Sequence, residues 1–154
     1  MAIVKKFYEA FSIKDVETMV AFYDRSIIFE DPAFGKLHGE QAKNMWRMLL
    51  HSQKEKSFKV VASKIRENSN EGTAYWEASY NFGKQKRKVH NRIEASFIIK
   101  NGKIIKHTDS FDLYKWSRQA FGITGTLIGW TPYFKKKLRT QILQRLASFE
   151  AKQT

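Results

Sequence analysis

The sequence contains no cysteine and no long apolar run. The absence of cysteine excludes disulfide bonds, thiolate metal sites and cysteine nucleophiles. No segment approaches the ~20 consecutive apolar residues that a membrane-spanning helix needs, and the longest candidate is FGITGTLIGW at residues 121–130. The start of the chain, MAIVKKFYEAF, has no apolar stretch of secretory-signal length. We therefore expect a soluble, cytoplasmic protein.

Aromatic and basic residues are abundant instead. Of the 154 residues, 42% are hydrophobic and 14% are aromatic, which is typical of a globular domain with one core. Lysine and arginine number 28 against 15 acidic residues, a net charge of +13. Much of this charge lies in KQKRKVHNR (84–92) and KKKLR (135–139). These segments fall on an expected turn and an expected helix face, so solvation explains them better than nucleic-acid binding does.

Apolar residues at helical spacing predict helices over residues 2–11 and 40–51, with another between them. Asp15 suits the N-cap of that middle helix, whose stripe runs to Tyr23, because its carboxylate can accept from an unpaired backbone N–H. The third helix has the stripe Ala42, Met45, Trp46, Leu49 and Leu50. SIIFED predicts a strand that ends before Pro32, because proline restricts the preceding residue to extended conformations.

From residue 57 onward the hydrophobic period changes to two, which predicts strands. The four segments are SFKVVASKIRE, TAYWEASYNFG, KVHNRIEASFIIK and KIIKHTDSFDLYKW. Asn101-Gly102, between the last two, is a strong two-residue hairpin signal. The segments therefore predict an antiparallel meander. A short helix, a glycine-rich crossover and a final helix with Pro132 in its first turn follow.

Three N-terminal helices and a curved antiparallel sheet predict an α+β fold, because each helix stripe needs the apolar face of the sheet to cover it. We expect this domain to occupy residues 1–116. Residues 117–154 would form a C-terminal helical extension that packs on the same domain.

The last strand places two polar residues on an apolar side. Ile105, Phe111 and Leu113 share that side with His107 and Asp109. Burial of an unpaired carboxylate is costly, so the sequence predicts pairing, a shifted pKa or a wet cavity. Two side chains at this spacing project into one space and could form an acid–base unit near neutral pH. The alternative is a satisfied core pair, with Asp109 capping a helix or accepting from indole N–H groups.

Further candidates would line the same pocket. Asp31 is a candidate proton acceptor, although an Asx-type turn before Pro32 is equally consistent with Asp-Pro. Asn91 lies on the inward side of its strand and could orient a substrate carbonyl or bond to Asp109. The aromatic wall, whose members could equally be plain core residues, would consist of Trp46, Trp76, Tyr80 and Phe111.

Histidine and acid spacing does not predict a metal site. His38, His51 and His90 are expected on the surface, and His107-x-Asp109 alone is weak evidence for a zinc ligand set. We expect neither a metal nor a cofactor.

The order helix, helix, FEDPAFGKLHG, helix and meander resembles the nuclear transport factor 2-like superfamily. This cone-shaped α+β fold is shared by SnoaL-like proteins, ketosteroid isomerases and limonene epoxide hydrolases. The resemblance rests on FYEAFSIKDVETMVAFYDRSIIFEDPAFGKLHG and NGKIIKHTDSFDLYKW. It implies a cone and, as in many relatives, a homodimer formed through the outer sheet face. The fold hosts isomerases, hydrolases, cyclases, dehydratases and proteins without catalysis, so it does not fix an activity.

The resemblance assigns family roles to some residues but not to others. Asp31 matches the general base of ketosteroid isomerases. Their oxyanion hole uses a tyrosine on the first helix, but here Phe7 occupies that position, and Tyr8 lies one step off the helix face that points inward. Glu94 matches their second donor, but strand alternation turns it outward. Asp109 matches an aspartate of limonene epoxide hydrolases, whose arginine and second aspartate are missing from YWEASYNF.

The sequence thus predicts a small-molecule binding protein or a cofactor-independent enzyme of the isomerase, hydratase or hydrolase type. Its ligand would be an apolar or aromatic small molecule, and Asp31, His107 and Asp109 would be the catalytic residues. The alternatives are a non-catalytic dimeric interaction domain and a basic adaptor for nucleic acid or anionic lipid. A membrane surface would be contacted through the basic C-terminal helix.

Overall fold

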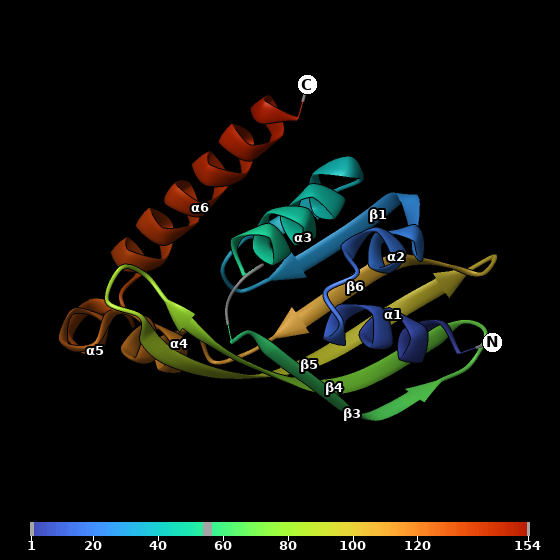
Figure 1. Ribbon diagram of the computed structural model, residues 1–154, viewed down its shortest axis with the longest axis horizontal. Helices are drawn as coiled ribbons and strands as arrows, with labels where there is room; N and C mark the ends of the chain where they lie inside the picture. Colours follow the sequence, from blue (N-terminus) through green and yellow to red (C-terminus); the bar gives the residue numbers. More distant parts are fainter. Residues whose placement is uncertain (1, 54–56, 154) are drawn as a thin grey trace.

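The computed structural model describes residues 2–53 and 57–153, which form a curved sheet with helices on one face and at one end (Figure 1). The strands are β1 (Tyr23–Asp31), β2 (Gly35–His38), β3 (Lys59–Glu67), β4 (Glu71–Phe82), β5 (Arg87–Lys100) and β6 (Lys103–Ser110). The helices are α1 (Ile3–Ser12), α2 (Val16–Ala21), α3 (Glu40–Ser52), α4 (Leu113–Phe121), α5 (Ile123–Ile128) and α6 (Pro132–Lys152). The predicted α+β class is confirmed.

The strands follow the order β2-β1-β6-β5-β4-β3 in one unclosed sheet of the described residues. β3 to β6 form the predicted antiparallel meander, and the Asn101-Gly102 turn joins β5 to β6. β1, by contrast, pairs in parallel with β6, with Phe29 opposite His107. This pairing across the chain brings the carboxyl ends of β1 and β6 to the same edge of the sheet.

Helices α1, α2 and α3 lie over the same face of the sheet and bury their apolar stripes there (Figure 1). The sequence predicts that Leu49 belongs to the buried stripe of α3, but it is 36% exposed, whereas Leu50 is buried. The middle helix is also shorter than predicted. It ends at Ala21, since Tyr23 already pairs with Ile104 as the first residue of β1.

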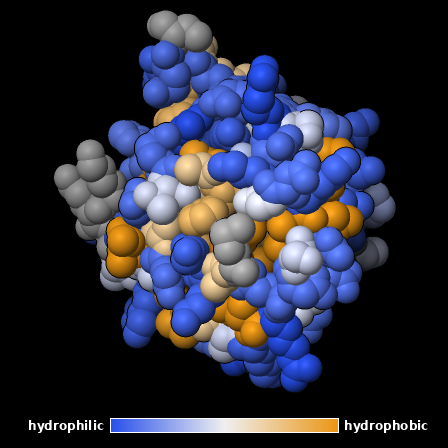
Figure 2. Space-filling model, turned by 90° about the vertical axis from the view of Figure 1, so that its right-hand side faces the viewer, coloured by the Kyte–Doolittle hydropathy of each residue, from blue (hydrophilic) through white to orange (hydrophobic). Residues whose placement is uncertain are grey.

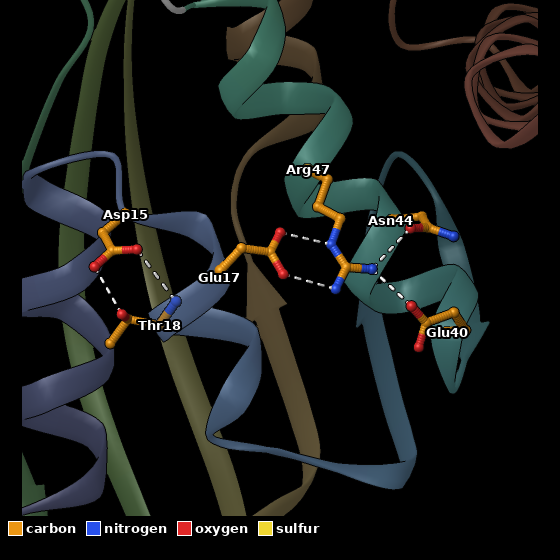
Figure 3. Close-up of polar contacts among 6 residues, drawn as sticks. All are labelled: Asp15, Glu17, Thr18, Glu40, Asn44 and Arg47. Atoms are coloured by element: carbon orange, nitrogen blue, oxygen red, sulfur yellow. Dashed lines mark hydrogen bonds and ion pairs between the residues drawn. The ribbon is translucent and has the colours of Figure 1, made fainter. Parts of the chain in front are cut away.

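Polar contacts fix the second helix against the third (Figure 3). Asp15 caps α2 as predicted, accepting from the backbone N–H of Thr18 at 3.2 Å. Arg47 of α3 donates to both carboxylate oxygens of Glu17 at 2.9 and 3.0 Å, and to Glu40 at 2.6 Å. A planar guanidinium that binds a carboxylate through two nitrogens sets orientation as well as distance. α2 and α3 are therefore held in a defined relative position.

The last strand differs from its prediction at both ends. A register shift changes the pairing from Ile98–Lys106 to Ile99–Ile104, so Ile105 is an extra residue in β6 and Ile104 is buried in its place. At the other end, Asp112 accepts from the N–H of Lys115 and begins α4. The prediction that Ile105, Phe111 and Leu113 continue the buried strand side is therefore wrong. His107 and Asp109 do lie on that side, 0% and 4% exposed.

The helices after the sheet pack through small residues and rings. In α5, a Cβ added at Gly125 would lie 2.0 Å from the carbonyl oxygen of Ser117 in α4. An outer aromatic cluster joins β4 to α4 and α6 through ring contacts of 5.4–5.8 Å among Phe82, Trp116, Phe121 and Phe134. Leu146 of α6 reaches the main core. The division of the chain at residue 116 stays a prediction.

The surface is mainly hydrophilic in the view of Figure 2, which faces the end of the molecule opposite to α5. Apolar residues appear there in patches between charged and polar ones. Among residues 2–53 and 57–153, no helix is both long and apolar enough to cross a membrane.

Replacement of Gly125 tests the tight contact between α4 and α5. We expect Gly125→Ala to lower the free energy of unfolding by about 1–3 kcal/mol, because the new methyl group would overlap the Ser117 carbonyl. Urea denaturation measures the change. Thr124→Ala, at an exposed position of the same helix, is the matched control and should be close to neutral. Equal stability of the two variants would contradict the packing described.

Candidate functional site

A row of hydrogen bonds crosses the main core. The indole N–H of Trp46 in α3 donates to the hydroxyl of Tyr23 in β1 at 2.9 Å, and this hydroxyl lies 2.6 Å from Nδ1 of His107. Nε2 of His107 lies 2.8 Å from Oδ1 of Asp109. The indole of Trp76 in β4 donates to the same oxygen at a longer distance, 3.4 Å. One row of hydrogen bonds therefore links α3, β1, β4 and β6, and the Asp109 carboxylate is its final acceptor.

The chemistry of these groups fixes the direction of donation. An indole nitrogen can only donate, so the Tyr23 oxygen accepts from Trp46 and its own proton is available for Nδ1 of His107. Nε2 of His107 then has the proton that Asp109 requires. The hydrogen bonds thus assign the Nε2–H tautomer to a neutral His107 and direct every donor toward Asp109.

Aromatic rings pack around the imidazole of His107. Phe97 stacks on it with ring centroids 4.2 Å apart, and the Trp46 ring lies nearly parallel to it, at an interplanar angle of 13° and a centroid distance of 6.1 Å. Phe7 and Phe29 make T-shaped contacts with the imidazole, with ring centroids 5.5 and 5.1 Å from its own. These contacts leave His107 0% exposed, so it can position Asp109 but has no surface of its own to offer a ligand.

The parallel pairing of β1 with β6 brings the two predicted carboxyl groups together. Phe29 lies opposite His107, and Glu30 lies opposite Thr108. Asp31 and Asp109 are the next residues on each strand, and both continue the inward row, since side chains alternate along strands. The negative charge of Asp109 raises the pKa of Asp31, which agrees with this proximity.

Asp31 combines a turn role with an unusual proton affinity. Its Oδ1 accepts from the backbone N–H groups of Ala33 and Phe34 at 2.9 and 2.6 Å, the Asx-type turn that Asp-Pro suggested. Part of the residue is exposed. Burial of the carboxyl group is nevertheless the main cause that raises its pKa from 3.8 to about 7, and the turn hydrogen bonds and Arg139 oppose this rise. Asp31 therefore exchanges its proton near neutral pH.

Tyr8 is a site residue that the sequence analysis missed. The expectation that it lies off the inward face is wrong, because α1 lies in the hollow of the curved sheet and buries Phe7 and Tyr8 alike. Its hydroxyl finds no hydrogen-bond partner within residues 2–53 and 57–153. Burial, followed by the charge of Asp109, raises its pKa well above the ordinary value. The spacing of Val4, Tyr8 and Phe11 was the available signal.

The remaining predicted residues are spread over the inner surface. Trp46 and Trp76 are buried and belong to the hydrogen-bonded row. Asn91 and Phe111 are half-buried. The hydroxyl of Tyr80 accepts from the indole of Trp116 at 2.8 Å, which directs it toward α4.

Surface hollows among the described residues include two that are lined mainly by other side chains. One of about 460 Å³ is lined by outward residues of the sheet such as Thr73, Ser96 and Thr108. Another of about 550 Å³ lies between α3 and α6. A pocket beside Asp31 and Asp109 stays a prediction. The described residues also contain no group of three or more histidine and acidic side chains that could hold a metal ion.

Comparison with known proteins assigns the family. The model of the SnoaL-like domain matches residues 4–107, which include α1 to α3 and most of the sheet. The chain belongs to the SnoaL-like domain family. The matched part of this SnoaL-like domain contains Asp31 and His107 and ends two residues before Asp109. No protein with a curated description matches the sequence significantly.

Solved structures share the fold of this SnoaL-like domain. A protein with a ketosteroid isomerase-like fold from Catenulispora acidiphila, in complex with trimethylamine, is 15% identical with a TM-score of 0.66 and covers 84% of this chain and 97% of its own. An LEH-like epoxide hydrolase from M. tuberculosis is 19% identical with a TM-score of 0.61, and the match covers 82% of this chain and 93% of the hydrolase. TerC, co-crystallised with polyporic acid, is 13% identical with a TM-score of 0.63, and the match covers 77% of this chain and 95% of TerC. At these identities the likeness shows the fold alone.

Removal of the Tyr23 hydroxyl tests the buried row. We expect Tyr23→Phe to lower the free energy of unfolding by about 1–3 kcal/mol, because Trp46 loses its acceptor and His107 loses its donor. Chemical denaturation measures this loss. Tyr133→Phe, which removes a hydroxyl from a residue 67% exposed, is the control and should change stability by less than about 0.5 kcal/mol. A neutral Tyr23→Phe would show that the row contributes little.

The raised pKa of Asp31 predicts a pH-dependent stability. The native state keeps this proton up to about pH 7, whereas the unfolded chain releases it near 3.8. Between these values the native state binds more protons, so its stability falls as pH rises, by at most about 4 kcal/mol. Asp31→Asn can still accept from Ala33 and Phe34 but does not titrate. The stability of wild type relative to this variant should therefore fall from pH 4 to 7, and parallel curves would refute the assignment.

Proposed function

We propose that this SnoaL-like protein binds an apolar or aromatic small molecule beside Asp31 and Asp109 and acts on it by proton transfer without a cofactor. Asp31 and Asp109 directly follow the paired residues Glu30 and Thr108 on neighbouring strands, and this register is the observation that carries the proposal. Pairs of titratable groups whose environments differ are the usual basis of acid–base catalysis. Isomerase, hydratase and hydrolase reactions can all use such a pair.

Each residue has a separate role in this proposal. Asp31 exchanges a proton with the ligand, since its pKa of about 7 leaves both forms populated near neutral pH. Asp109 supplies a carboxylate acceptor, and His107 is a positioning residue that holds it through Nε2. The buried hydroxyl of Tyr8 has an unused proton to donate to a ligand oxygen.

The partly exposed end of the site offers the route for a ligand. Asp31, Asn91 and Phe111 are half-buried, whereas the core around His107 is closed. Movement of side chains at that end would open space against the indole of Trp76 and the ring of Tyr80. The neighbours crystallised with polyporic acid and with trimethylamine support a small-molecule role for this cone.

A second candidate is a non-catalytic domain that pairs with another copy through the outer sheet face. Ile98 of β5 and Val61 of β3, which are 46% and 50% exposed, favour this arrangement, because apolar side chains on an outer sheet face suit an interface between copies.

A ligand screen separates the two candidates. Ligands of the proposed site should bind Asp109→Asn at least about tenfold more weakly than wild type, because the charge that fixes the site is lost. Glu94→Gln, which neutralises an exposed acid on the outer face, is the matched control and should bind like wild type. Affinities are measured by NMR titration with apolar and aromatic fragments.

Two results would contradict the first candidate. One is equal affinity of every fragment for wild type and Asp109→Asn. The other is the absence of any fragment that binds, combined with a dimer in light scattering that Ile98→Asp converts to a monomer. That combination would favour the second candidate.

A further inference from the structure

Large apolar side chains gather at the surface between residues 123 and 133. Of the nine large hydrophobic residues that are exposed in the described part of the chain, five lie in this segment. They form what we term the α5 patch, which consists of Ile123, Leu127, Ile128, Trp130 and Tyr133, at 80%, 66%, 38%, 62% and 67% exposure. Concentrated exposed apolar residues mark an interaction surface, whereas single ones are ordinary.

Glycines explain why these side chains point outward. The inner side of α5 is Gly125, and Gly129 follows one turn later, both packed so closely on Ser117 of α4 that a methyl group would not fit. Tyr114 of α4 also donates its hydroxyl proton to the carbonyl of Thr126 at 2.9 Å. The helix therefore docks on α4 through its backbone, and its large side chains are left for something outside the described chain.

Basic residues flank the α5 patch on one side through the turn between β4 and β5. Nε of Arg87 donates to the carbonyl of Gln119 at 2.8 Å, and its guanidinium lies against Gly122, at the start of α5. Lys84 and Lys86 of this turn and Lys88 of β5 are all exposed. Figure 1 shows the turn, α5 and the start of α6 at the same end of the molecule.

The first turns of α6 supply further positive charge near the α5 patch (Figure 1). Lys135, Lys136 and Lys137 are exposed immediately after the patch. The outer aromatic cluster joins this helix start to β4 and α4, so both basic segments keep their places beside α5. From Leu113 to Phe149 the sequence has seven lysines and arginines and no acidic residue. The surroundings of the patch are thus strongly and uniformly positive.

We propose that the α5 patch docks on an anionic lipid bilayer. Aliphatic side chains would enter the interface between headgroups and acyl chains, where Trp130 and Tyr133 are also favoured. The flanking lysines and arginines would contact anionic headgroups, and each would raise the binding constant about fivefold. This differs from the expectation that α6 as a whole contacts the membrane, because α6 turns Phe134, Leu138 and Leu146 inward and contributes only Tyr133 and basic residues of its first turns.

Charge and chemistry favour a bilayer over other partners. In a twofold dimer the same patch would face itself, which would bring the basic segments of two copies together. Nucleic acid would match the charge but would leave Ile123 and Leu127 without an apolar environment. The patch lies apart from Asp31 and Asp109, so this inference is independent of the proposed function.

Vesicle co-sedimentation of the full chain tests the proposal. We expect binding to vesicles of 70% phosphatidylcholine and 30% phosphatidylserine, and much weaker binding to pure phosphatidylcholine. Binding should decrease as salt rises from 50 to 500 mM, because exposed charges are screened. Lipids brominated on their acyl chains should quench the fluorescence of wild type more than that of Trp130→Phe, since Trp130 is the tryptophan placed in the interface.

Two matched pairs of variants locate the binding surface. Leu127→Asp should weaken binding at least about tenfold, whereas Ile13→Asp, at a residue 73% exposed beside α1, should not. Lys136→Gln should weaken binding about fivefold, and Lys5→Gln, with the same charge change on α1, should have a smaller effect. Thermal unfolding of all four checks that they are folded.

Several results would overturn the proposal. These are an absence of binding to anionic vesicles at 50 mM salt, and equal binding by Leu127→Asp and Ile13→Asp. A wild-type dimer that Leu127→Asp converts to a monomer would show that a second copy covers the patch. Retention on duplex DNA with no retention on vesicles would show that nucleic acid is the partner.

Discussion

The buried carboxylate of Asp109 is the constraint on which the centre of this protein depends. An ionised group in an apolar core is costly unless donors compensate it, and here His107 and Trp76 do so. The requirement extends outward, because a fully buried imidazole needs a partner at its other nitrogen and finds Tyr23, which in turn accepts from Trp46. One charge therefore aligns β1, β4, β6 and α3.

The Asp109 carboxylate also favours the protonated forms of its neighbours. It contributes to the raised pKa values of Tyr8, Tyr23 and Asp31, although burial is the larger cause in each case. Arg139 of α6 donates to the carbonyls of Pro32 and Ala33, so the turn that holds Asp31 depends on the C-terminal helix as well as on the cone.

Local signals made much of the fold predictable. The Asn101-Gly102 turn and the change of hydrophobic period identified the meander, and the α+β class followed. The proximity of Asp31 to Asp109 depended on a parallel pairing between distant segments, which no local pattern encodes. Tyr8 was missed because curvature of the sheet, rather than helical spacing alone, decides how wide a stripe α1 buries. The candidate residues of the strands were therefore accessible to sequence reasoning, whereas Tyr8 and the arrangement of the candidates were not.

The extra residue Ile105 determines which side chains reach the core. Side chains alternate along a strand, so an extra residue reverses the two sides of everything that follows it unless a bulge absorbs it. Counted from buried Ile104 by simple alternation, Lys106 and Thr108 would face inward, and His107 and Asp109 would face water. The bulge at Ile105 keeps His107 and Asp109 in the core, so the polarity of the interior depends on one local irregularity of the backbone as well as on the side chains themselves.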